Sequence, residues 1–262
     1  MRAVVVVPTY DEVSNLAQIV ARLRTAQPDV DVLVVDDASP DGTGALADEL
    51  ALADTRVHVL HRAQKRGLGK AYLDGFAWAL AGEYDVVGQM DADGSHQPEQ
   101  LGLLLGALQD PAAPADFVIG SRWVRGGSIA NWPVHRELLS RGGNLYTRVL
   151  LGIPIRDATS GFRLLRRTAL ERLELQTIAS SGYVFQVDVV VRAVAAGLRI
   201  VEVPIEFLER ERGDSKMDAR VAAESLRRIT AWGLRERRRR VAGLLRRRWR
   251  GTQRRPDTLD RP

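Results

Sequence analysis

Two aspartates, Asp91 and Asp93, stand two residues apart directly after an apolar run that ends at Met90. Where a strand ends and the chain turns, two carboxylates this close together can approach one cation. Hard oxygen ligands suit Mg²⁺ or Mn²⁺, which keep water ligands and bridge substrate phosphates. The same residues would also suit a plain turn, since Asp and Gly are common where strands end. The pair is therefore a candidate metal site that needs support from the rest of the chain.

Two further polar clusters follow apolar runs, at residues 8–12 and 36–42. A nucleotide-binding sheet often places an acidic residue after its second strand, where it accepts hydrogen bonds from a ribose or base. In the first cluster, Tyr10 could face a base and Glu12 could accept a hydrogen bond from it. Both clusters could instead be strand-to-helix turns that carry helix caps.

Several other kinds of site are excluded. No G-x-G-x-x-G follows the first apolar run, which argues against a Rossmann dehydrogenase, and residues 67–70 lack the P-loop spacing. The chain has no cysteine, so disulfides, thiolate metal sites and cysteine nucleophiles are ruled out. No stretch approaches the roughly 20 apolar residues of a spanning helix, and the N-terminus does not look like a signal peptide. A soluble or peripheral protein is expected.

Apolar runs alternate with helical patterns, which favours βαβ units and a mostly parallel sheet. Hydrophobic residues make up 45% of the 262-residue sequence, enough for a sizeable core. Ligands of open parallel sheets sit at the carboxyl ends of the strands. Because the polar clusters fall at those ends, one cleft is expected to collect them. We expect strands at residues 3–7, 30–35, 57–60, 84–90, 116–120 and 198–203, and helices at 13–25, 43–52, 69–81, 98–108, 144–151 and 185–196.

The C-terminal part of the chain is strongly basic. Eleven arginines and one glutamate lie between Arg235 and Arg255, within a total formal charge of +5, so the remaining body is mildly acidic. A helix that mixes dense arginine with leucine, valine and tryptophan is typical of an anionic lipid surface. Nucleic-acid binding and a solvated extension are the alternatives. We expect a basic, amphipathic helical extension over residues 218–262.

Taken in order, the clusters resemble glycosyltransferase family 2, and most closely its polyprenol/dolichol-phosphate mannose synthase branch. The resemblance covers about residues 3–217, and nine motifs in order make it specific. It implies an α/β, GT-A-type, mostly parallel nucleotide-binding sheet flanked by helices, with a catalytic domain at residues 1–217. The matching motifs are Pro8-Thr9-Tyr10-Asp11-Glu12, Val35-Asp36-Asp37, Arg66-Gly67-Leu68-Gly69, Asp91-Ala92-Asp93, Gly120-Ser121-Arg122, Arg136 with Ser140, Thr159-Ser160-Gly161-Phe162-Arg163, Gly182-Tyr183-Val184-Phe185-Gln186 and Arg212-Gly213-Asp214-Ser215-Lys216.

The resemblance also implies roles for individual residues. Some members of the family have glutamine where this chain has Ser95, and we expect water to take the place of that metal ligand here. In the implied site, Pro8, Tyr10, Glu12 and Asp37 hold the nucleotide, together with Asp91, Ala92 and Asp93. Asp91 and Asp93 bind Mg²⁺ or Mn²⁺, and Arg212 and Lys216 neutralise donor phosphates. The implied catalytic residues are Asp93, which holds the metal, and Arg122, Arg136 and Ser140, which receive the acceptor phosphate.

The implied reaction is inverting transfer of mannose from GDP-mannose to a polyprenyl phosphate. The alternatives are glucosyl transfer from UDP-glucose and a non-catalytic nucleotide or nucleic-acid binder. Spanning helices and a Gln-x-x-Arg-Trp motif are missing, which disfavours a processive polysaccharide synthase. We expect the protein to act at the cytoplasmic face of a membrane, as a peripheral protein, or in the cytoplasm. The arginine-rich helix is expected to contact anionic lipid, and a separate membrane protein is a candidate partner. No nucleic acid is expected to bind.

Overall fold

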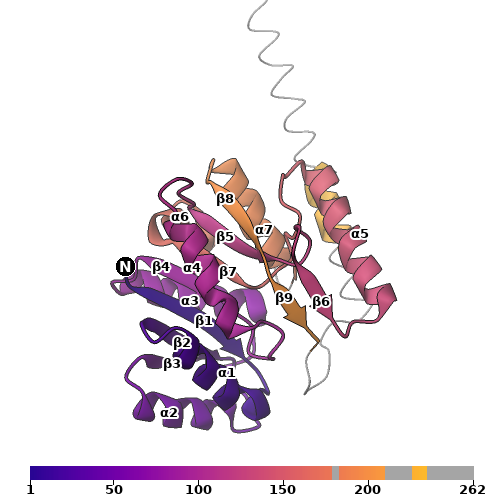
Figure 1. Cartoon of the computed structure of the whole chain (residues 1–262). Helices are drawn as coiled ribbons and strands as arrows, with labels where there is room; N and C mark the ends of the chain where they lie inside the picture. Colours follow the sequence, from indigo (N-terminus) through magenta and orange to yellow (C-terminus); the bar gives the residue numbers. More distant parts are fainter. Residues whose placement is uncertain (179–182, 210–225, 235–262) are drawn as a thin grey trace, which may run out of the picture.

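A computed structural model describes residues 1–178, 183–209 and 226–234, and a seven-stranded sheet forms its centre (Figure 1). The strand order is β3-β2-β1-β4-β7-β5-β8. Neighbouring strands are parallel except at β7, which runs antiparallel to both β4 and β5. The strands are β1 (Ala3–Thr9), β2 (Val30–Asp36), β3 (Val57–His61), β4 (Val86–Gln89), β5 (Phe117–Ser121), β7 (Arg163–Arg166) and β8 (Ile200–Pro204).

Helices cover both faces of this sheet, and each face has its own apolar core. Residues of α1, α2 and α4 pack on one face, and residues of α3, α6 and α7 pack on the other. Strands buried on both sides read as continuous apolar runs, as in β1, where four consecutive valines are buried. The helices are α1 (Val13–Ala26), α2 (Thr43–Ala53), α3 (Leu68–Ala81), α4 (Leu101–Gln109), α5 (Val134–Leu151), α6 (Arg167–Glu171) and α7 (Tyr183–Ala195), with short 3₁₀ turns η1 (Pro98–Gln100) and η2 (Leu175–Thr177).

Beyond the carboxyl ends of β4 and β5, a smaller unit stands beside the sheet. It contains the parallel pair β6 (Ser128–Ala130) and β9 (Glu206–Leu208), the long helix α5 and a helical segment at residues 226–234. That segment lies against α5, where the Tyr146 hydroxyl and the Thr230 hydroxyl are 2.7 Å apart (Figure 1). No helix in the described part of the chain is long and apolar enough to cross a membrane.

The mostly parallel α/β sheet is confirmed, and the predicted strands and helices are present, but the start of one helix was wrong, and β6, β7, β9 and α6 were not predicted. Helix α5 begins at Val134, ten residues before the predicted start at Asn144. Its cavity-lining face carries small and polar residues, and the apolar residues that recur at helical spacing are exposed, so the pattern is not that of a helix buried by an apolar face. Strand β7 was missed, since an arginine at each end leaves only two leucines as an apolar signal. The predicted extension at residues 218–262 is described only at 226–234, which is helical.

Candidate active site

The loops after β1 and β2 are bound to each other at the carboxyl edge of the sheet. The backbone N–H of Asp11 donates to the Ser39 hydroxyl at 3.2 Å, and that of Glu12 donates to the Thr43 hydroxyl at 3.0 Å. Asp11 and Ala38 both have positive φ, of 55° and 57°. Left-handed backbone in non-glycine residues costs free energy and clusters at functional sites. The two loops thus form one rigid, strained rim.

The predicted nucleotide residues of the first loop lie on this rim. Glu12 is 9% exposed and accepts a hydrogen bond from the Asn15 side-chain amide at 2.8 Å. Pro8 and Tyr10 are half-buried. The ammonium of Lys65 lies 3.4 Å from the centroid of the Tyr10 ring, so a cation–π contact covers one face of that ring. The base contacts of these three residues stay predictions.

Asp37 holds a loop together. Its buried carboxylate pairs with Arg62 and accepts backbone N–H groups from Arg66 and Gly67, each at 3.1 Å. Gly67 has a φ of +88° and precedes the first residue of α3. Asp37 therefore anchors the start of α3, and its predicted contact with the nucleotide would have to be made alongside these bonds.

Asp91 and Asp93, which both lie just after the end of β4, line one cavity together. Asp93 accepts the backbone N–H of Ser95 at 3.0 Å, and Ser95 is 3% exposed. Among the described residues, no group of three or more His, Cys, Asp or Glu residues could hold a metal ion. The donor set that the described residues offer, two carboxylates, fits Mg²⁺ or Mn²⁺, which usually takes its other ligands from water and substrate phosphates.

Two residues that the sequence analysis gave no role hold Asp91 in place. The Tyr72 hydroxyl donates to Asp91 Oδ1 at 3.1 Å, and the backbone N–H of Asp91 donates to His96 Nδ1 at 3.1 Å. Burial lowers the pKa of His96 despite the neighbouring carboxylates. The imidazole is therefore neutral at pH 7, with Nδ1 as an acceptor. His96 stands within the sequence that follows the Asp91-Ala92-Asp93 motif, but Tyr72 comes from α3 and leaves no local signal.

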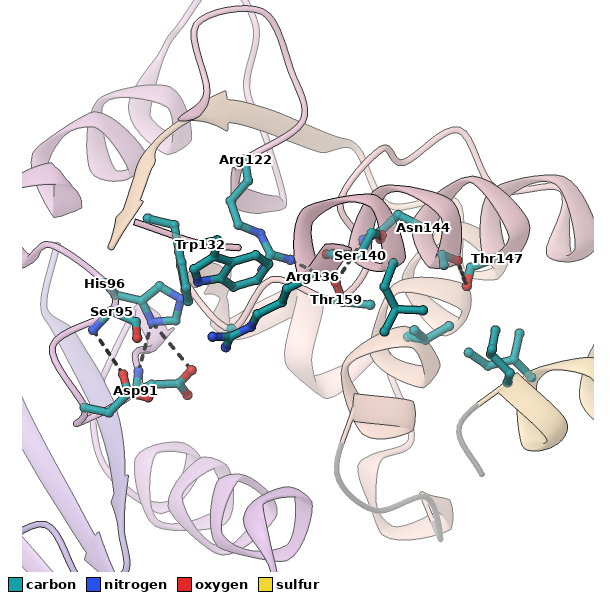
Figure 2. A pocket seen from close by; sticks show the side chains of 18 residues that line it. Asp91, Ser95, His96, Arg122, Trp132, Arg136, Ser140, Asn144, Thr147 and Thr159 are labelled. Carbon is teal, nitrogen blue, oxygen red and sulfur yellow. Dashed lines mark hydrogen bonds and ion pairs between the residues drawn. The ribbon is translucent and has the colours of Figure 1, made fainter. Parts of the chain in front are cut away.

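The cavity extends from these aspartates to the inner face of α5. Figure 2 shows Asp91, Ser95 and His96 at one end, Trp132 and Arg136 in the middle, and Ser140, Asn144 and Thr147 on α5 beyond them. The far end is apolar, with Leu139 on α5 and Leu226 and Ile229 on the helical segment at residues 226–234. The cavity volume is about 150 Å³. Arginines next to an apolar end suit a ligand with a phosphate and a hydrocarbon chain, and the anionic end suits a cation.

Arg122 is buried in an ion pair. Its Nε and Nη2 donate to the two oxygens of Asp157, each at 2.7 Å, and Nη2 also donates to the Thr159 hydroxyl at 2.9 Å. Asp157 is fully buried; burial raises its pKa, but the charge and hydrogen bonds of Arg122 outweigh this, so the pKa lies below its usual value. The Asp157 pairing was not predicted. A phosphate contact of Arg122 would have to use the guanidinium edge that faces away from Asp157.

Arg136 and Ser140 lie one turn apart on the cavity side of α5. Arg136 Nη1 donates to Glu209 Oε1 at 2.8 Å, and its guanidinium carbon lies 4.1 Å from the centroid of the Trp132 ring. The side chain is 20% exposed, so a phosphate in the cavity can reach it. The structure thus brings together five predicted residues: Asp91, Asp93, Arg122, Arg136 and Ser140. Arg212 and Lys216 lie outside the described residues.

A buried arginine joins the site to the core. Arg163 is fully buried and donates to the backbone carbonyls of Ser160, Gln186 and Ala158 at 2.6, 2.9 and 2.7 Å. Burial lowers its pKa to about 9, which is still high enough for a charged guanidinium at pH 7. Arg163 therefore fixes the loop before β7, which carries Thr159 into the cavity wall.

Comparison with known proteins gives a consistent result. Residues 4–174 match the model of glycosyl transferase family 2. The polyprenol monophosphomannose synthase of Mycolicibacterium smegmatis is 52% identical over 246 residues, which are 94% of this chain and 92% of that protein. The undecaprenyl-phosphate mannosyltransferase of Micrococcus luteus is 52% identical over 234 residues, 89% of this chain and 95% of that protein.

Solved structures share the fold at low sequence identity. Glucosyl-3-phosphoglycerate synthase of Mycobacterium tuberculosis, solved with Mn²⁺, UDP and its product, is 22% identical and covers 90% of this chain and 79% of its own, with a TM-score of 0.63. A mannosyltransferase of Pyrobaculum calidifontis, solved with GDP-mannose and Mn²⁺, is 19% identical and covers 89% of this chain and 64% of its own, with a TM-score of 0.58. These likenesses confirm the predicted GT-A architecture.

Proposed function

Since the chain belongs to glycosyltransferase family 2, we propose that it transfers mannose from GDP-mannose to a polyprenyl phosphate with inversion at the anomeric carbon. The names of relatives that share 52% of its residues over most of its length support mannose as the sugar and a polyprenyl phosphate as the acceptor. The observation that carries the proposal is the cavity, which joins two carboxylates to an apolar end through arginines.

The chain's own groups would divide the work between donor and acceptor. Asp91 and Asp93 would hold Mg²⁺ or Mn²⁺, which when bound neutralises the charge that develops on the departing diphosphate. Pro8, Tyr10, Glu12 and Asp37 would hold the guanine nucleotide at the strained rim, and Ala92 would lie against it. Arg212 and Lys216 would add positive charge beside the diphosphate.

The acceptor side needs orientation more than proton transfer. A lipid phosphate is anionic near neutral pH, so it can attack without a general base, whereas a sugar hydroxyl normally needs one. Arg136 is suited to binding it, because a guanidinium donates two parallel hydrogen bonds to a phosphate. Arg122 and the Ser140 hydroxyl would complete the phosphate site and align it with the anomeric carbon.

A transfer assay with four donor and acceptor combinations tests this proposal. We expect turnover with GDP-mannose and polyprenyl phosphate, none without the lipid phosphate, and a β-linked product identified by its one-bond proton–carbon coupling. An α-linked product would exclude single displacement. Turnover with UDP-glucose in place of GDP-mannose would favour the second candidate donor, for which the UDP-bound neighbour is the supporting observation. Nucleotide binding without any transfer would leave only a binding role.

We further propose that the outer face of α5 faces the bilayer. Arg141 and Arg148 lie beside this face, as expected for an interfacial helix on anionic lipid. Because α5 lies next to the apolar end of the cavity, the hydrocarbon chain of the polyprenyl phosphate would stay in the membrane while its phosphate enters the site. The exposed apolar side chains at helical spacing are Val134, Leu138, Leu145 and Val149, which are 71%, 64%, 60% and 65% exposed.

Replacing Leu138 and Leu145 together by Asp is expected to weaken binding to vesicles containing anionic phospholipid at least about tenfold, because each buried leucine contributes roughly 1.5–3 kcal/mol. Vesicle co-sedimentation measures this. The matched control is Leu52→Asp on α2, which is 89% exposed and far from the cavity. Deleting residues 235–262 tests the basic extension separately: if the deletion abolishes binding and the α5 variant binds normally, the extension alone carries the membrane contact.

A further inference from the structure

Tyr72 reaches the candidate metal site from inside the core. It stands on α3, is fully buried, and its ring stacks on Phe185 with centroids 6.0 Å apart and planes 4° from parallel. Its hydroxyl donates to Asp91 Oδ1 at 3.1 Å. Burial, with the nearby Asp91 charge, raises the pKa of Tyr72 well above its usual value. The hydroxyl therefore stays protonated and is fixed by the packing of its ring.

Gly161 and His96 also confine Asp91. A Cβ added at Gly161 would lie 3.1 Å from Asp91 Oδ2 and 3.2 Å from Oδ1, so the absence of a side chain there leaves the carboxylate its place. The ring of His96 accepts the Asp91 backbone N–H. The position of the Asp91 carboxylate is thus defined by Tyr72, Gly161 and His96, which come from three separate segments of the chain.

We propose that Tyr72 is a positioning residue for Asp91, whose Oδ1 it binds so that the carboxylate is oriented for the divalent cation of the donor diphosphate. This inference rests on the proposed function, in which Asp91 is a metal ligand. The tyrosine touches neither the cation nor the sugar. Outer-shell partners of this kind typically change metal affinity by about 10–100-fold when they are removed.

The chain offers a matched control for the loss of the hydroxyl. Tyr84 is 3% exposed, and its hydroxyl donates to the buried carboxylate of Asp31 at 2.8 Å. It precedes β4, whereas Asp91 follows that strand. Tyr84→Phe therefore removes the same group from the same kind of bond at the opposite end of the sheet, away from the cavity.

The test is a Mn²⁺ titration of the full chain with GDP present, read from the electron paramagnetic resonance signal of free Mn²⁺. We expect Tyr72→Phe to weaken Mn²⁺ binding about 10–100-fold, and Tyr84→Phe to leave it unchanged. Raising Mn²⁺ should restore kcat in Tyr72→Phe, since the protein then fills its site despite the weaker affinity. Gly161→Ala, whose added Cβ would lie 3.1 Å from Asp91 Oδ2, should displace the carboxylate and weaken Mn²⁺ binding in the same way.

The outcomes separate this inference from the proposed function. Asp91→Asn is expected to remove most of the Mn²⁺ affinity. If it does, and Tyr72→Phe binds Mn²⁺ like the unmodified protein, the positioning role is wrong and the metal site stands. If Asp91→Asn itself binds Mn²⁺ normally, the metal site of the proposed function is wrong. Equal losses in Tyr72→Phe and Tyr84→Phe would indicate general destabilisation and would also overturn the inference.

Discussion

Asp93→Ala is expected to lower kcat at least about a thousandfold, which corresponds to roughly 4 kcal/mol of lost transition-state stabilisation. The reason is the small number of ligands: in the described residues the cavity offers two carboxylates for a cation, and no third acidic or histidine group completes a cluster. Removing Asp93 halves the carboxylates that the described part of the chain offers to the cation. The measurement is initial-rate transfer of radiolabelled mannose to polyprenyl phosphate at saturating donor.

The loss should come from the site and leave the fold intact. Asp93 accepts the Ser95 N–H within its own turn after β4, a local contact away from the core, so circular dichroism and the unfolding midpoint should change little. Asp29→Ala serves as the matched control, because that side chain is fully exposed and lies 3.9 Å from Arg56 on the other side of the molecule. Near-normal turnover of Asp93→Ala, or of the unmodified protein in EDTA, would contradict the metal assignment.

The parts of this site that the sequence predicts are those with local causes. Asp91 and Asp93 follow a strand whose apolar run is visible, and parallel strands bring their carboxyl ends to one edge. The strand-end loops could therefore be placed before the fold was known. The inner face of α5 could not be, because the apolar residues of this helix that recur at helical spacing are exposed, whereas its cavity-lining face is mostly small and polar.

The supporting residues could not be predicted from local pattern, because their partners are far away in sequence. Tyr72 lies 19 residues from Asp91, and Asp157 lies 35 residues from Arg122. Only folding brings each pair together: Tyr72 lies on α3 and Asp91 follows β4, whereas Arg122 follows β5 and Asp157 lies between α5 and β7. A motif shows which residues recur, but it does not show which buried groups hold them in position.

Asp157→Asn is expected to destabilise the protein by about 3–5 kcal/mol at pH 7, because it leaves the buried Arg122 charge uncompensated. The pKa of Asp157 lies below its usual value. The carboxylate therefore contributes stability above its unfolded-state pKa of about 3.9, and this contribution is lost as the pH falls through the lower, folded-state pKa. Urea unfolding of the two proteins should differ at neutral pH and converge in acid.

A double replacement separates stability from function at this pair. Arg122→Met with Asp157→Asn removes both charges with little change in volume, and the amide oxygen of the new side chain can still accept the backbone N–H of residue 122 that Asp157 accepts at 3.0 Å, so no buried charge is left uncompensated. We expect unfolding stability near that of the unmodified chain, together with a raised KM for polyprenyl phosphate and an unchanged Kd for GDP. Arg122 would then be shown to act on the acceptor. If the double variant keeps its full affinity for polyprenyl phosphate, the pair is structural only, and Arg136 is left as the arginine that receives the phosphate.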